Sequence, residues 1–121
     1  MATREETFIF SSVIRGHHVY KETWTPYISE NLTANIEEDN PHDRHAIALT
    51  RSAGDIVGHM PQKIPPLCWF FIRNGGSIKS VVTGKRRKGI GLEVPCDYVC
   101  CGSQRMIKKL KRLLSQVDTQ S

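Results

Sequence analysis

The chain has 121 residues, of which 39% are hydrophobic and 24% are charged. This length predicts one domain with a modest core. No apolar run approaches the roughly 20 residues that a membrane-spanning helix needs. The first six residues lack the apolar centre of a signal peptide, so we expect an intracellular protein whose cysteines are reduced thiols.

Charge is distributed unevenly along the chain. Residues 1–72 carry 6 Lys and Arg against 9 Asp and Glu, a net charge of −3, whereas residues 73–121 carry 11 against 3, a net charge of +8. A basic half predicts an anionic partner, with nucleic acid as the first choice. The alternative is a solvated surface that is merely basic.

The first strand is expected at residues 7–13, after a disordered N-terminus over residues 1–6. It continues past Gly16 towards Tyr20, and a glycine inside a long strand indicates a bend of the kind that small barrels require. The loop that follows holds Trp24 and Tyr27. Each of these aromatic rings either folds back onto the core or offers a flat face on which a base can stack.

Three further strands are expected at residues 32–36, 46–51 and 56–60, the last two joined as a hairpin. Between the first two of them, Asn40-Pro41 favours a tight turn, because proline fixes its φ angle and asparagine can bond its own backbone. A side chain at the point where a rigid turn enters a sheet can be held still and still meet a ligand.

The segment from Pro61 to Arg73 predicts a helix of two to three turns that covers one end of the barrel. Trp69 and Phe70 could form a stacking platform, but adjacent apolar residues on a short helix are more often core. Residues 77–83 then form a fifth strand.

A basic loop bounded by glycines follows at residues 84–91, and residues 92–99 form a sixth strand, which Pro95 suggests is an edge strand. The loop holds four consecutive cations, Lys85, Arg86, Arg87 and Lys88. These either contact phosphates or stay solvated.

The last predicted element is a basic amphipathic helix over residues 103–117, capped by Ser103 and followed by a tail at residues 118–121. Its apolar stripe can dock on the barrel, bind a membrane surface or dimerise. The helix is therefore also a possible site of self-association or of contact with a host protein.

Three motifs carry a resemblance to a known family. Asn40-Pro41-His42-Asp43-Arg44-His45-Ala46-Ile47 resembles the N-P-[YH]-D-x-x-A-[IV] signature of HIRAN domains. The stretches Val13–Gly16 and Val57–Pro61 resemble that family's first strand and the end of its hairpin, in the correct order. The resemblance spans about residues 12–99. HIRAN domains occur in helicase-like transcription factor and in related DNA-repair and transposon-associated proteins.

The resemblance implies a mainly β fold, a small OB-like six-stranded β-barrel with a short capping helix, over residues 7–102. It also implies a nuclear module that binds the free 3′-OH end of single-stranded DNA, in repair, replication-fork processing or a transposon-related protein. Asp43 would accept a hydrogen bond from the 3′-OH, and Trp24 and Tyr27 approximate the family's aromatic pair. His42 stands where the family often has tyrosine. The expected phosphate partners are Arg44, His59, Lys63 and Lys21, with the four cations of the basic loop as an addition specific to this chain.

Other readings of these residues remain open. Asp43 could instead cap the Asn-Pro turn or pair with Arg44 or Arg15. The whole domain could be a protein-interaction or assembly module without end-specific DNA binding. An enzyme is not expected, because no catalytic motif or carboxylate pair is present. No cofactor is expected, and the spacing of Cys96 and Cys100 relative to the histidines fits no familiar zinc pattern.

Overall fold

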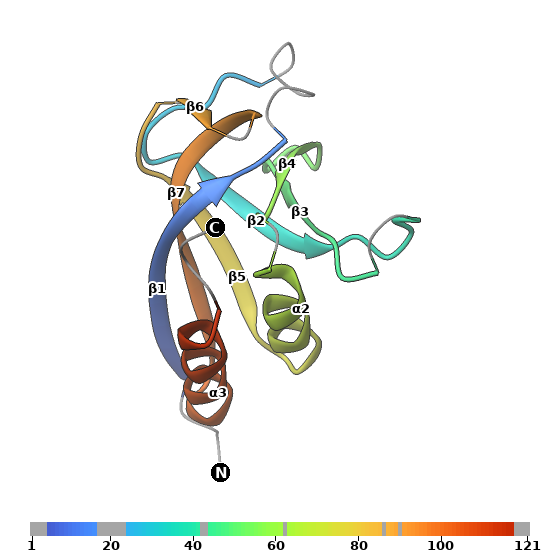
Figure 1. Ribbon diagram of the computed structural model, residues 1–121, viewed down its shortest axis with the longest axis vertical. Helices are drawn as coiled ribbons and strands as arrows, with labels where there is room; N and C mark the ends of the chain where they lie inside the picture. Colours follow the sequence, from blue (N-terminus) through green and yellow to red (C-terminus); the bar gives the residue numbers. More distant parts are fainter. Residues whose placement is uncertain are drawn as a thin grey trace.

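The computed structural model describes residues 5–16, 24–41, 44–61, 63–85, 87–89 and 91–117. These residues form a curved antiparallel sheet with two helices at one end of it (Figure 1). The strands are β1 (Glu5–Ile14), β2 (Asn31–Ile36), β3 (Ile47–Thr50), β4 (Ile56–His59), β5 (Ser77–Val82), β6 (Arg87–Gly89) and β7 (Gly91–Ser103), and the helices are α2 (Pro65–Arg73) and α3 (Gln104–Ser115).

The main sheet has the strand order β1-β7-β5-β2-β3-β4 and stops just short of closure. Within the described residues, its two edge strands meet at a single bridge, in which Arg15 and His59 exchange two backbone hydrogen bonds of 2.9 Å. Gly58 permits this approach, because a Cβ atom there would lie 2.5 Å from Ile14 Cγ2 and 2.9 Å from the Arg15 carbonyl oxygen. The predicted OB-like fold of six strands and two helices is therefore confirmed, as an open sheet.

The core follows from the alternation of side chains along the strands. In β2, Leu32 and Ala34 are buried between exposed neighbours, and in β5 Ile78 and Val82 are buried in the same way. All four residues of the Ala46–Leu49 segment are buried. Because successive side chains of a strand point to opposite faces, this run of buried residues indicates that β3 is covered on both faces of the sheet.

The prediction that Pro95 marks an edge strand is wrong. The strand β7 lies in the sheet between β1 and β5 and runs on to Ser103, well beyond the predicted end. Thr83 N–H donates to the Pro95 carbonyl at 3.0 Å. Pro95 has no N–H with which to donate a hydrogen bond back to Thr83. Accordingly, β5 ends at Val82, the residue before Thr83. The proline therefore ends one ladder inside the sheet.

The basic loop is also different from the prediction. Residues 87–89 form the short strand β6, which pairs with the beginning of β7 as a hairpin. At the other end of the chain, β1 begins at Glu5 rather than Thr7, because Glu5 and Glu6 pair with Ser103 and Gly102 of the unexpectedly long β7.

Both helices lie side by side at the end of the sheet where β1 begins (Figure 1). In α2, Cys68 and Phe71 are buried, but Phe70 remains 38% exposed, so the prediction that it belongs to the core is wrong. In α3, the Ser103 hydroxyl accepts from the Met106 N–H at 3.3 Å, which confirms the predicted cap. Among the described residues, no helix is long and apolar enough to cross a membrane.

The apolar stripe of α3 docks on the domain. Ile107 and Leu110 are buried in the same core as β1 and β7 residues such as Ile14 and Tyr98. Of the three roles considered for this helix, docking is thus the one that the structure shows. The stripe is not available as a free apolar face for a membrane or a second copy of the chain.

Candidate nucleic-acid interface

The turn after β2 is held at both of its sides by polar contacts. On one side, Glu37 lies 3.3 Å from His59 Nε2 and accepts a hydrogen bond of 2.6 Å from the Asn40 side chain. On the other side, Glu38 forms an ion pair with Arg73 of α2. Acidic residues that the sequence left unexplained therefore anchor the turn to β4 and to α2.

An aromatic contact supports the end of the same turn. The His45 ring packs edge-on against Trp69 of α2, with 5.0 Å between centroids, and the Arg73 guanidinium lies 5.2 Å above the Trp69 ring. Trp69 is thus half-buried, packing against the core and supporting the turn at the same time. The predicted residues Asp43 and His42 lie outside the described residues.

Two of the predicted phosphate partners, Arg44 and His59, lie at this turn. Arg44 is exposed in the turn, and His59 sits at the end of β4 beside Glu37. Lys63 follows shortly after β4 and is exposed, with a positive φ of 79°. A non-glycine residue in this conformation is strained by about 1–2 kcal/mol, and such residues gather at functional sites. Lys21 lies outside the described residues.

The two aromatic residues of the loop before β2 have opposite environments. Trp24 is only 2% exposed, and its Nε1–H donates to both Glu30 carboxyl oxygens at 3.0 and 3.1 Å. Its ring therefore cannot offer a stacking face in this structure, and the alternative that it folds onto the core is the one observed. Tyr27 is 64% exposed and remains available for stacking.

Tyr27 and the turn do not meet. The Tyr27 loop precedes β2 and the turn follows it, and Figure 1 shows the two segments on opposite sides of the sheet. The six residues of β2 span roughly 17 Å at about 3.3 Å per residue. One terminal nucleotide would not span this distance, and joint recognition by Asp43 and an aromatic of this loop stays a prediction, because Asp43 lies outside the described residues. A strand of several nucleotides could reach both.

The basic hairpin lies near the Tyr27 loop, because Ser29 N–H donates to the carbonyl of Val82 and Lys85 follows shortly after. Lys85 is exposed. Arg86 lies outside the described residues, and Arg87 and Lys88 enter β6. Their role in phosphate binding stays a prediction.

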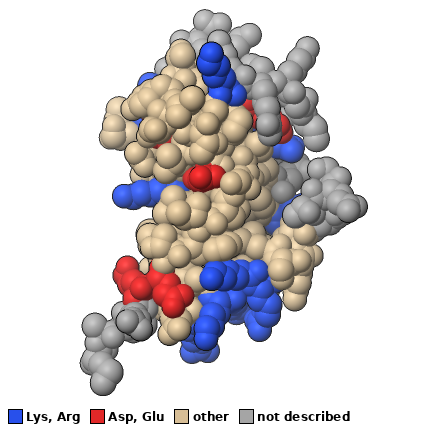
Figure 2. All heavy atoms as spheres, turned by 90° about the vertical axis from the view of Figure 1, so that its left-hand side faces the viewer, with Lys and Arg blue, Asp and Glu red and all other residues tan. Residues whose placement is uncertain are grey.

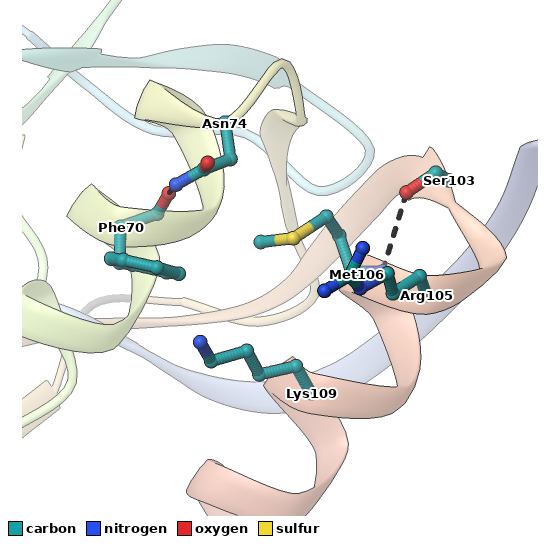
Figure 3. Close-up of a pocket in the computed structure, with 6 residues that line it drawn as sticks. All are labelled: Phe70, Asn74, Ser103, Arg105, Met106 and Lys109. Carbon is teal, nitrogen blue, oxygen red and sulfur yellow. Dashed lines mark hydrogen bonds between the residues drawn. The ribbon is translucent and has the colours of Figure 1, made fainter.

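A third surface, between the two helices, was missed as a site by the sequence reasoning. A groove of about 380 Å³ separates α2 from α3, and Figure 3 shows the Lys109 side chain reaching towards the Phe70 ring there. The distance from Lys109 Nζ to the ring centroid is 4.2 Å. The sequence did signal both parts, as a basic helix face and an adjacent aromatic pair, but not that they meet.

The cysteines are mostly sealed inside the domain. Burial raises the pKa of Cys96 to about 11 and that of Cys100 to about 12, and it also raises the pKa of Cys68. These groups are protonated and unreactive at neutral pH. Among the residues that the structure describes, no three His, Cys, Asp or Glu side chains are grouped so as to hold a metal ion.

The open OB-like sheet, with a turn braced between a strand end and a helix, is the arrangement of a known class of small β domains. HIRAN domains are among the solved structures that share it. The crystal structure of the HIRAN domain of human HLTF matches with a TM-score of 0.72 and 20% identity, over 89% of this chain and 87% of that one. The NMR structure of the HLTF HIRAN domain in its DNA-bound conformation matches with a TM-score of 0.74 and 19% identity, over 93% and 90%.

A crystal structure of a protein from Lactobacillus plantarum is similar at a TM-score of 0.58 and 13% identity, over 79% of this chain and 98% of that one. No family model matches the sequence, and no curated protein matches it significantly. The chain therefore has the fold of a HIRAN domain over about nine tenths of its length.

Proposed function

We propose that this chain is a DNA-binding module rather than an enzyme, and that it holds the end of a single strand at the turn after β2. The observation that carries the proposal is the likeness to a HIRAN domain in its DNA-bound conformation over 93% of this chain. Nuclear location and a role in DNA repair, expected from the resemblance, belong to the same proposal.

The braced turn supports this proposal physically. Because Glu37 and Glu38 are engaged by His59 and Arg73, the turn can keep one geometry without spending binding energy on ordering it. The exposed cation Arg44 lies in the turn, and the exposed Lys63 follows β4, the strand that carries His59. Cations that flank a fixed loop are suited to the phosphates next to a strand end.

The finer part of the proposal concerns the 3′ end itself. Asp43 accepts a hydrogen bond from the free 3′-hydroxyl, and His42 contacts the terminal nucleotide in place of the family's usual tyrosine. A carboxylate that accepts this bond would repel a 3′-phosphate. Tyr27 stacks a base further along the strand rather than the terminal one, in keeping with its place beyond the far end of β2.

The test is fluorescence anisotropy on one oligonucleotide with either a free 3′-OH or a 3′-phosphate, and on one whose 5′ end alone is accessible. A hydrogen bond to a charged acceptor contributes about 1.5–3 kcal/mol, so Asp43→Asn should weaken binding to the free 3′ end by roughly ten- to a hundredfold. Binding of the 3′-phosphate, which is weak from the start, should not fall and should rise if anything, because asparagine does not repel the phosphate.

A matched control comes from Asp39, an exposed acidic residue of the same turn. Asp39→Asn removes the same charge and should leave the preference for the free 3′ end intact. If the three oligonucleotides bind equally well to the wild-type chain, end recognition is absent, although DNA binding as such would stand. If none binds, the DNA-binding proposal itself fails.

A further inference from the structure

The exposed side of α3 is a continuous strip of positive charge. Its members are spaced at i, i+3, i+4 and i+7, which places them on one helix face. We call them the α3 basic face: Arg105, Lys108, Lys109 and Arg112. The helix contains no acidic residue, and Figure 2 shows lysine and arginine side chains gathered at this end of the molecule.

None of these four charges takes part in an ion pair within the described residues, and one of them, Lys109, lies over the Phe70 ring of α2. The salt bridges that the described residues do form lie elsewhere in the domain. Four like charges within two turns repel one another. A structural role would favour interspersed acidic residues, whereas an anionic ligand would relieve the repulsion.

The groove beside this face adds an aromatic surface. Phe70 is exposed in it, with Met106 and the aliphatic part of Lys109 as neighbours (Figure 3). Cations next to an exposed aromatic ring are the combination by which single-stranded nucleic acids are bound, with phosphates on the cations and bases on the ring.

The face of α2 connects this groove to the turn. Trp69 and Arg73 contact the turn through His45 and Glu38, while Phe70 and Asn74 line the groove on the α3 side. The exposed surface of one short helix therefore leads from the proposed end-binding turn to the α3 basic face. The acidic residues Glu5 and Glu6, at the start of β1, border α3 on its other side.

We propose that the α3 basic face and the α2–α3 groove form a second contact for single-stranded DNA, which takes the phosphates of the strand that leaves the turn. This inference rests on the proposed function and extends its footprint. From Arg105 to Arg112 the helix rises about 10 Å, which is long enough to lie beside roughly two successive phosphates of a single strand. A membrane surface fits poorly, because the apolar side of α3 is buried and could not insert.

The experiment compares two double variants of the full chain, each of which removes two positive charges. Arg105→Gln/Lys109→Gln alters the proposed contact. Lys79→Gln/Lys111→Gln is the control, since Lys79 lies on β5 and Lys111 packs over Phe8 on the β1 side of α3. Each protein is titrated with free-3′-OH strands of about 4 and about 20 nucleotides, which bracket the usual site size of one OB fold.

The proposal expects a loss that depends on strand length. Each phosphate contact contributes about 0.7 to the slope of log K against log salt, so losing two should lower the slope by about 1.4 and weaken binding of the long strand about 25-fold at about 0.1 M salt. The short strand should bind the altered protein as well as it binds the wild type. The control should bind both strands like the wild type.

Three results would overturn it. If the two double variants lose affinity for the long strand equally, the effect is one of net charge and not of this surface. If the wild type binds the short strand as tightly as the long one, the second contact does not exist while the proposed function survives. If a polyglutamate peptide binds as tightly as the long strand and the α3 variant alone loses it, the surface serves an acidic protein. Failure of the wild type to bind either strand would instead reject the proposed function.

Discussion

Trp24 and Tyr27 lie three residues apart in one loop, and the structure assigns them different tasks that mutation can separate. The Trp24 ring is 2% exposed and bonded to Glu30, whereas Tyr27 is 64% exposed. We expect Trp24→Ala to reduce the stability of the fold, and Tyr27→Ala to reduce DNA binding without a change in stability.

The cost of Trp24→Ala can be worked out from its contacts. Truncating a buried tryptophan removes about 3–5 kcal/mol. Glu30, itself 7% exposed, would also lose a hydrogen-bond donor, at a cost of about 1–3 kcal/mol. The sum is a large part of the about 5–15 kcal/mol that stabilises a typical domain. At about 4 °C per kcal/mol for a chain of this size, the melting temperature should fall by at least about 15 °C.

The effect of Tyr27→Ala should appear only in binding. One base stack contributes about 1–3 kcal/mol, so affinity for a strand of about 20 nucleotides should fall roughly five- to 150-fold. Tyr27→Phe keeps the ring and is the matched control, which should retain nearly all of the affinity.

Thermal unfolding followed by circular dichroism, with fluorescence anisotropy on the same samples, measures both effects. A Trp24→Ala protein that melts like the wild type would show that the ring is not part of the core in solution. A Tyr27→Ala protein with unchanged affinity and an unchanged melting temperature would remove this loop from the DNA footprint.

Three further outcomes follow from burial. Leu110→Asp places a charge in the core and should lower the melting temperature by several degrees or more; equal stability with a change from dimer to monomer in sedimentation would instead make α3 an assembly element. The buried thiols should resist a thiol reagent at about pH 8 until the domain unfolds, while the half-buried Cys101 reacts first. Because burial raises the pKa of the thiols, the folded state keeps their protons to a higher pH than the unfolded state does. The contribution of the thiols to stability should therefore be fully present below the ordinary thiol pKa of 9.0 and be lost as the pH rises towards about 11; a stability that is flat between these values would contradict the burial of Cys96 and Cys100. 

The sequence determined the local elements of this protein. The alternation in β2 and β5, the glycine of the β3–β4 hairpin and the Ser103 cap depend on neighbours within a few residues, and all are read from the chain itself. The order of the three HIRAN-like motifs also predicted the fold class, and the solved HIRAN domain structures have the same fold as this chain.

The place of a strand in the sheet was decided by partners far away in the chain. Pro95 suggested an edge, but an edge is a property of both neighbouring strands, and β7 lies between β1 and β5 because of pairings 70 or more residues apart on one side. Proline is tolerated there since its missing N–H falls where β5 has already ended.

The candidate site was decided in the same way. The sequence shows which loops contain aromatic and charged residues. Only the tertiary structure shows that Trp24 is buried against Glu30 while Tyr27 is exposed to solvent. It also shows that β2 separates Tyr27 from the turn, and that Phe70 meets Lys109 across two helices. Side-chain exposure and distance between loops are set by packing across the whole sheet, and a pattern read along one segment does not contain them.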